Sequence, residues 1–220
     1  MQNADVFSTK SDYVYTQLKD KILKGVLKQG ESITISRIAE EYSISAIPVR
    51  EALKRLETEG LVEIIPHKGA QVVTLNNDRI KEVISIRAVL EGYAARTALP
   101  YMDEEKIGIL KKMAEKMREH ALAGDSEKFG AENKEFHRFL YKQSPFPMLY
   151  DMIFNLWDGG NWSKAIFAFN PERMKDSINE HIEIIAAIEK QDEEKTEILV
   201  RMHKERIGKL LLEISKFWFA

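Results

Sequence analysis

The stretch IAEEYSISAIPVREALKRLETEGLV, residues 38–62, decides how the first third of the chain folds. Its apolar residues recur at threes and fours on both sides of Ser43-Ile44-Ser45, which predicts two short helices joined by a tight turn. Pro48 falls in the first turn of the second helix, where a backbone N–H has no partner to lose. Gly60 supplies the positive φ that often ends a helix. Such a pair is either an ordinary helical hairpin or a helix-turn-helix that enters the major groove of DNA.

The residues after Gly60 favour the second interpretation. Residues 62–65 have the composition of a strand, 66–69 that of a turn, and 71–75 that of a returning strand. A helix-turn-helix closed by a hairpin with a basic tip is a winged helix. In this part the chain resembles the GntR family of bacterial transcription regulators. The resemblance rests on runs at set spacings: PVREAL at 48–53, LE at 56–57, EGLV at 59–62 and HKG at 67–69.

The predicted winged helix carries basic residues on its second helix and on the wing. The candidate DNA contacts are Ser45, Arg50, Lys54, Arg55, His67, Lys68 and Gly69, with Arg50 the first choice for a base or phosphate. Residues 1–75 contain ten basic and ten acidic residues, so the positive potential that DNA requires must be local. Ala46 and Ile47 stand where relatives usually carry Arg and Thr, so a relative's operator cannot be assigned to this chain.

The 220-residue chain is long enough for two modest domains, and we place their boundary after residue 75. Its hydrophobic fraction of 44% is ample for packed cores, and its net charge is −2. The absence of cysteine excludes disulfides and thiolate metal sites. No apolar run reaches membrane-spanning length and the N-terminus does not look like a signal peptide. We therefore expect a cytoplasmic protein with no membrane partner.

Residues 76–220 show helical periods and no convincing strand, which predicts a mainly α protein whose second domain is an all-helical bundle of six or seven members. The predicted helices are 78–99, 103–123, 125–143, 148–157, 171–190 and 193–217. The expected caps are Ser11 or Asp12 for the first helix of the chain, and Asp103, Asp125, Asn170 and Asp192 in the bundle. We interpret the aromatic residues Phe154, Trp157, Trp162, Phe167 and Phe169 as core rather than as a pocket lining.

Three of the five histidines lie in the apolar stripe of a helix. Asn133 and His137 share the apolar face of one helix, His181 lies in that of a second, and His203 in that of a third. A single inward histidine is usually a hydrogen-bonded core residue, but three in one bundle are costly to bury without partners. A shared divalent metal would satisfy them, and imidazole with an oxygen ligand suits zinc, nickel, cobalt, copper or iron. From spacing alone, a metal site and a polar core remain equally open.

The second half resembles the ligand-binding domain of the FadR-type branch of GntR regulators, the FCD domain. The matching residues are Arg87, Leu90-Glu91, Ala94-Ala95, Asn133, Phe136-His137, Glu180-His181 and Met202-His203. The resemblance implies that Asn133, His137, His181 and His203 hold a divalent metal, zinc or nickel first, and that a small carboxylate effector binds beside it. Asn133 stands where many relatives have Asp, which implies weaker metal affinity. Arg87 is the candidate effector contact, and its alternative is a surface ion pair with Glu91.

Together these features predict a dimeric, ligand-responsive transcription regulator with a winged helix at residues 1–75 and a metal- and effector-binding bundle at 76–220. A homodimer is expected to bind a two-fold-related operator in double-stranded DNA, because one short recognition helix reads too few bases. Two alternatives are a metal-dependent enzyme that acts on small organic acids and a helical interaction protein with structural histidines. No pair of histidines around a glutamate, typical of hydrolytic metal helices, supports the enzyme.

Overall fold

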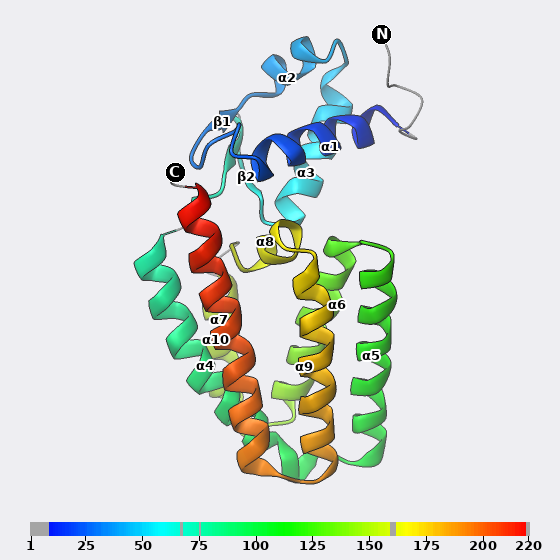
Figure 1. Cartoon of the computed structure of the whole chain (residues 1–220), viewed down its shortest axis with the longest axis vertical. Coiled ribbons are helices and arrows are strands. Elements are labelled where there is room, and N and C mark those ends of the chain that lie inside the picture. The colour runs from blue at the N-terminus through cyan, green and yellow to red at the C-terminus, as the bar shows by residue number, and fades with distance from the viewer. Residues whose placement is uncertain (1–8, 67, 75, 159–161, 219–220) are drawn as a thin grey trace. The chain divides into compact units, whose positions relative to one another are not determined.

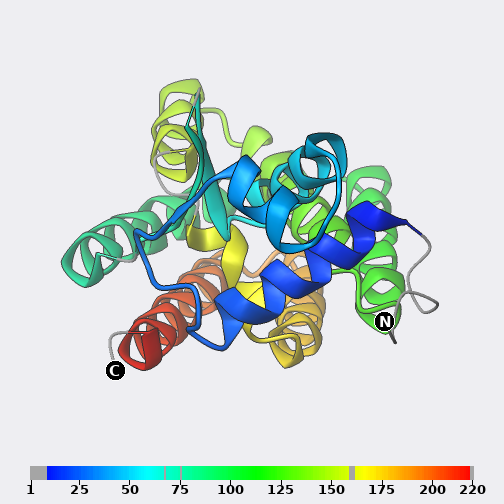
Figure 2. The same ribbon diagram turned by 90° about the horizontal axis from the view of Figure 1, so that it is seen from above.

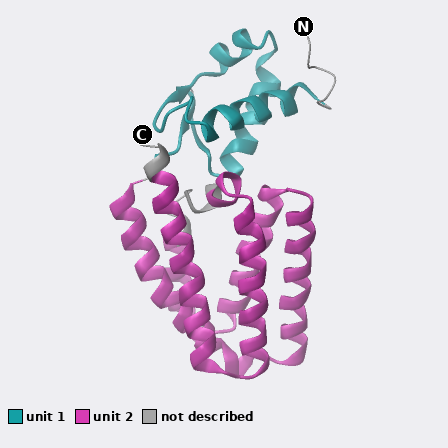
Figure 3. Cartoon of the chain, viewed as in Figure 1, with its two compact units in different colours: residues 1–75, 216–220 teal, residues 76–215 magenta. Residues whose placement is uncertain are grey.

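The computed structural model describes residues 9–66, 68–74, 76–158 and 162–218, without the side chains of 157–158, 162–165 and 216–218. The chain divides into two compact units (Figures 1 and 3). The first comprises residues 1–75 with 216–220, and the second comprises residues 76–215.

Three helices form the core of the first unit: α1 (Lys10–Leu23), α2 (Ile35–Glu41) and α3 (Ala46–Thr58). α1 buries Val14, Leu18 and Ile22 and packs against α3. The helix begins earlier than predicted, because Thr9 rather than Ser11 or Asp12 is its cap. The Thr9 hydroxyl accepts the backbone N–H of Asp12 at 3.0 Å and donates to its carboxylate at 2.6 Å.

A small antiparallel sheet completes this unit, with strand order β1-β3-β2. Its strands are β1 (Ser32–Ile33), β2 (Val62–Ile65) and β3 (Gly69–Val72). β3 begins at Gly69, two residues earlier than predicted, and β1 is an addition that the sequence did not indicate. Gly69 has a φ of 115°, and a Cβ there would lie 2.3 Å from the carbonyl oxygen of Ile33. Glycine is therefore required where β1 and β3 approach. The predicted winged helix-turn-helix is confirmed.

The second unit is all helical in its described part, as predicted. Its helices are α4 (Asn77–Ala98), the short η2 (Leu99–Tyr101), α5 (Glu104–Leu122), α6 (Ser126–Lys142), α7 (Pro147–Asp158), α8 (Trp162–Phe169), α9 (Glu172–Glu189) and α10 (Glu193–Trp218). Figure 2 looks down on the end of the bundle where α9 begins and α10 ends. α5 packs on α6 and α9, and α4 packs on α6 and α7. None of the described helices is long and apolar enough to span a membrane.

Side-chain caps start several of these helices as the sequence predicts. Asp103, Asp125 and Asp192 each accept the backbone N–H of the residue three positions on, at 2.8–3.0 Å. Asn170 does not cap α9. α9 begins at Glu172, so Pro171 takes the capping position, and its side chain offers no hydrogen-bond acceptor.

The aromatic interval around α7 and α8 contributes to the core in part. Phe167 is buried and packs edge-to-face on Phe129, with ring centroids 4.7 Å apart. Phe154 and Phe169 are half-buried. The predicted core positions of Trp157 and Trp162 lie outside the described side chains.

Candidate DNA-binding surface and metal centre

A basic concavity lies between α3 and the wing in the first unit. Its volume is about 670 Å³, and its lining includes four of the predicted DNA contacts, Arg50, Lys54, Lys68 and Gly69. Arg50 and Lys54 are exposed one turn apart on α3, and within the described residues neither forms a salt bridge. Their charges are therefore available to a nucleic-acid phosphate or base edge.

Two hydroxyl residues join this basic concavity that the sequence did not indicate. Thr34 and Ser36, at the start of α2, line it together with the wing residue Pro66. Hydroxyls beside basic side chains are ordinary phosphate donors in protein–DNA interfaces. The sequence could not indicate them, because they precede the predicted helix-turn-helix in the chain. The pairing of β1 with β3 brings them beside the wing.

Two further predicted contacts, Arg55 and Ser45, do not line the basic concavity. Arg55 forms a salt bridge with Asp12 at 2.6 Å and covers the ring of Tyr15, so it joins α3 to α1. Ser45 is the exposed residue before α3 and makes no capping hydrogen bond. His67 lies outside the described residues.

Two acidic side chains of or after α3, Glu57 and Glu59, are held by contacts of their own and do not line the basic concavity. Glu57 accepts the backbone N–H of Ile64 at 3.1 Å. Glu59 is buried, where it accepts a hydrogen bond from Tyr15 and pairs with Lys19. Among the described residues, the charged ones that line the concavity are the basic Arg50, Lys54 and Lys68.

Three histidines meet inside the second unit, from α6, α9 and α10. His137, His181 and His203 are fully buried, and their candidate ligand atoms lie within 4.8 Å of one another. The Nε2 atom of His137 lies 3.2 Å from that of His203 and 3.2 Å from that of His181. A tetrahedral zinc with bonds of about 2.0–2.1 Å holds its nitrogens roughly 3.3 Å apart. The spacing therefore fits nitrogens that share one ion.

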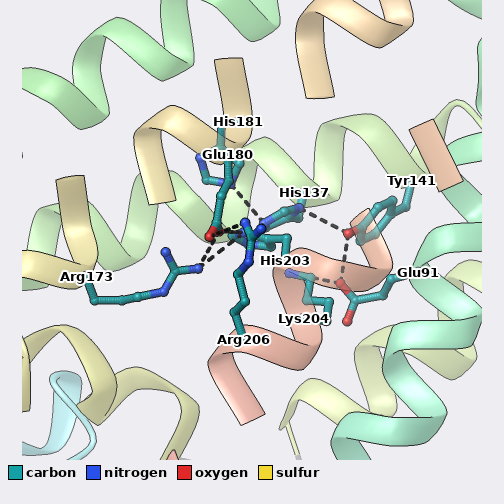
Figure 4. A network of polar contacts seen from close by, with 9 residues as sticks. All are labelled: Glu91, His137, Tyr141, Arg173, Glu180, His181, His203, Lys204 and Arg206. Carbon is teal, nitrogen blue, oxygen red and sulfur yellow. Dashed lines mark hydrogen bonds and ion pairs between the residues drawn. The ribbon is translucent and has the colours of Figure 1, made fainter. Parts of the chain in front are cut away.

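The outer ring nitrogens fix where the protons lie (Figure 4). Tyr141 donates its O–H to Glu91 at 2.8 Å, so its oxygen accepts the Nδ1–H of His137 at 3.1 Å. Nδ1 of His203 lies 2.5 Å from the carboxylate of Glu180, which accepts its proton. A neutral imidazole has one N–H. Nε2 of His137 and Nε2 of His203 therefore both present lone pairs, with no proton between them.

Electrostatics keep these imidazoles neutral. Burial lowers the pKa of His137 well below its ordinary value of 6.5, and the positive charge of Lys204 lowers it further. Burial likewise lowers the pKa of His181, followed by the effect of His203, and lowers the pKa of His203, followed by that of Lys204. A second proton, which would relieve the facing lone pairs, is therefore disfavoured at neutral pH.

Asn133 is the residue whose oxygen the resemblance assigns to the same site. It lies one turn before His137 on α6 and is 8% exposed. Its Oδ1 is buried and has no hydrogen-bond partner among the described residues. Leaving a buried carbonyl oxygen without a partner costs about 1–3 kcal/mol, an amount that a hydrogen-bond donor or a cation would remove. Three imidazole nitrogens within reach of one ion are donors suited to a divalent transition metal, and a carbonyl oxygen is compatible with them.

Arg87 is buried and not at the surface, but it does pair with Glu91. Its Nε donates to the Glu91 carboxylate at 2.7 Å, and Lys204 approaches the other carboxylate oxygen at 3.0 Å. Burial lowers the pKa of Lys204 to about 8, and Glu91 opposes that shift. A chain of hydrogen bonds through Glu91 and Tyr141 thus connects Arg87 to His137. The positive charge of Arg87 also helps to lower the pKa of His137.

Several residues of this network were not singled out from the sequence: Tyr141, Arg173, Lys204 and Arg206. Tyr141 is four residues after His137 on one helix face, a spacing that would have suggested contact. The other three are charged residues in or beside apolar stripes, a pattern typical of buried ion pairs. Only the fold shows that Arg173 and Arg206, from α9 and α10, meet at Glu180.

Comparison with known proteins places both units. Residues 10–72 match the family described as bacterial regulatory proteins, gntR family, and residues 82–206 match the FCD domain. The chain belongs to the GntR family. As a member with an FCD domain it is a DNA-binding transcriptional regulator and not an enzyme.

Relatives in this family match the chain over most of its length. The HTH-type transcriptional regulator McbR of Escherichia coli K12 is 28% identical over 82% of this chain and 83% of its own. The uncharacterized regulator YdhC of Bacillus subtilis is 28% identical over 86% of this chain and 85% of its own. The solved structure of E. coli McbR/YncC superposes with a TM-score of 0.61 at 25% identity and covers 94% of this chain and 99% of that one.

Proposed function

We propose that this GntR regulator is a homodimer whose bundle binds a divalent metal and a small carboxylate effector, and that the effector changes its affinity for a two-fold-related operator. The observation that carries the proposal is the pair of imidazole lone pairs, on His137 and His203, that face each other at 3.2 Å in a buried site. A single N–H on Nε2 of His181, 3.2 Å from Nε2 of His137, would leave the His203 nitrogen without a donor, whereas one cation accepts the lone pairs of both nitrogens.

The proposed metal ligands are Nε2 of His137, His181 and His203, with Oδ1 of Asn133. Zinc or nickel suits this set of nitrogen and oxygen donors. Tyr141 and Glu180 hold two of the rings in the tautomer that a metal requires. When bound, the ion supplies a Lewis-acidic position for a carboxylate oxygen. Arg87 contributes positive charge to the surroundings of the effector, because its field acts on His137.

The proposed dimer is supported by an apolar face on α4. Ile86, Val89 and Tyr93 recur at threes and fours on this helix, and their side chains are 43%, 50% and 45% exposed. Tyr93 stacks on Phe146, which is also exposed, with ring planes 8° apart. A contiguous apolar patch of this kind favours an interface between copies of the chain. We call these four residues the α4 face.

Elemental analysis of protein purified without chelators tests the metal. We expect about one zinc or nickel per chain, and a single His181→Ala change should lose most of it. His120→Ala is the matched control, because His120 on α5 is not a member of the cluster. Adding metal at 100 times its Kd should stabilise the parent by about 2.7 kcal/mol. An unchanged melting temperature with added zinc and nickel, and no stoichiometric metal, would mean that the histidines are polar core.

A further inference from the structure

Unpartnered polar atoms mark one face of α9 beside the histidine cluster. Three buried side-chain atoms have no hydrogen-bond partner among the described residues: Nε of Arg173, Oγ of Ser177 and Nδ1 of His181. The three residues follow one another at intervals of four, so they lie on the same helix face in successive turns. The three residues are 4%, 0% and 0% exposed. A protein that leaves three neighbouring buried polar atoms unsatisfied bears a cost that a ligand can remove.

The proposed metal does not satisfy these three atoms. If Nε2 of His181 binds the ion, its neutral ring carries the remaining proton on Nδ1, which is then a donor. The corresponding nitrogens of His137 and His203 already have Tyr141 and Glu180 as partners. Nε of Arg173 is also a donor, and the hydroxyl of Ser177 can donate. Among the described residues, the three donors on this face of α9 therefore have no acceptor, and carboxylate oxygens are acceptors only.

Charge points to the same kind of ligand. Glu180 receives two guanidinium groups, Arg173 at 2.5 Å and Arg206 at 2.9 Å, so it balances only one of them (Figure 4). The proposed metal ligands are three neutral imidazoles and a neutral amide, which offset neither charge of a divalent ion. Two positive charges in this region therefore attract an anion: the charge of the metal ion and the charge of Arg173.

We infer that Arg173 and Ser177 form a second anion subsite on α9, and that the effector is a small dicarboxylate. One carboxylate binds at the metal and the other accepts hydrogen bonds from Arg173 and Ser177. The inference rests on the proposed function, since it needs the metal-bound carboxylate, and it adds the second subsite. Because the acid neutralises the ion and Arg173 together, metal and dicarboxylate bind more tightly in each other's presence.

The test compares succinate and malonate with acetate and propionate on full-length, zinc-loaded protein. By calorimetry, we expect the dicarboxylates to bind at least about tenfold more tightly than the monocarboxylates. Succinate should also raise the zinc affinity, measured by competition with a chromophoric chelator, whereas acetate should do so less. Equal effects of mono- and dicarboxylates on zinc-loaded protein would overturn the second subsite and leave the metal proposal intact. Failure of the parent to bind zinc at all would instead overturn the proposed function, and this inference with it.

Ser177→Ala separates a ligand role from a structural role. Removing a buried hydroxyl that has no partner should leave the acid-free melting temperature unchanged or raised. The same variant should lose most of the preference for succinate over acetate. Arg173→Gln should lose it as well, whereas Arg206→Gln, which removes a guanidinium from the same Glu180 carboxylate, should keep it. A Ser177→Ala variant that melts lower without acid, or that keeps the full preference for succinate, would contradict the assignment.

Discussion

Arg50 and Lys68 both line the basic concavity, and we expect them to contribute differently to DNA binding. Arg50 projects from α3, the helix that reads bases in a helix-turn-helix, so Arg50→Ala should cost about 1–3 kcal/mol on a selected site. Lys68 lies on the wing and is expected to contact a phosphate. Lys68→Ala should therefore weaken binding to all DNA sequences evenly and lower the slope of affinity against salt concentration by about one. Fluorescence anisotropy on selected and scrambled duplexes across a salt series measures both effects.

Lys24→Ala is the charge-matched control for these variants. Lys24 follows α1, pairs with Asp20 and does not line the concavity. It should change neither the affinity for the selected site nor the preference for it. Equal loss by Arg50→Ala on selected and scrambled duplexes would reassign Arg50 to phosphate contact.

The three buried histidines also predict how the stability of the metal-free protein depends on pH. Burial holds their pKa values well below 6.5 in the folded chain, whereas an unfolded histidine titrates near 6.5. As the pH falls below 6.5 the unfolded state takes up protons that the folded state does not. The stabilisation is therefore complete above 6.5 and is lost below it, by up to about 1.4 kcal/mol per histidine per pH unit.

Urea denaturation of chelator-treated protein between pH 7.5 and 5.5 measures this loss. His181→Ala should reduce the pH slope by roughly a third, since it removes one of the three buried histidines. His120→Ala should leave this part of the slope in place. A urea midpoint that does not move over the range would show that these histidines take up protons in the folded state as readily as in the unfolded state.

At the scale of helices and strands, periodicity predicted the elements that bury one continuous apolar face. The α9 stripe, from Met174 through Ile178 and Ile185 to Ile188, and the caps of α5 and α6 were readable because they depend on neighbours within a turn. β1 was not readable, because two residues carry no period and pair only when β3 returns. α8 was missed because eight largely apolar residues after Gly160 show no polar face to define a helix.

The same distinction applies to the histidine site. Spacing along α6, α9 and α10 indicated which histidines face inward, because each stripe is local. It did not indicate that Arg173 and Arg206 meet at Glu180, or that Lys204 approaches Glu91, since those contacts join different helices. Asn133 and Ser177 both lie in such stripes, yet only the packed structure shows that their oxygens lack partners.

The α4 face gives a prediction at the level of one element. Val89→Glu places a charge in the middle of the apolar stripe, so it should disfavour a two-fold contact in which each α4 face meets the other. We expect the sedimentation coefficient to fall to that of a monomer. Operator affinity should fall strongly, because a monomer contacts only one half-site.

Leu122→Glu is the matched control for that variant. Leu122 is 84% exposed at the end of α5 and is not a member of the α4 face, so it makes the same kind of change elsewhere. It should remain dimeric. If Val89→Glu also sediments as a dimer, another surface joins the two copies.

For the whole molecule, the proposed function requires that effector and DNA alter each other's affinity. A ligand shifts a conformational equilibrium only if it binds the two arrangements differently, and the coupling is then reciprocal. We expect succinate to weaken operator binding of the zinc-loaded dimer by about 5- to 150-fold, the usual range of such couplings. The operator should weaken succinate binding by the same factor, which titrations in both directions measure.

Two variants locate the two ends of this coupling. His181→Ala should remove the effect of succinate while leaving the acid-free affinity for the operator near that of the metal-free parent, because the concavity that carries Arg50 belongs to the other unit. Arg50→Ala should weaken binding to the operator. It should leave the affinity for succinate in the absence of DNA unchanged, since Arg50 lines the concavity and does not belong to the histidine cluster. Factors that differ between the two titration directions would show that the acid acts at a site other than the one measured. An equal response of metal-free and zinc-loaded protein would remove the metal from the sensing mechanism.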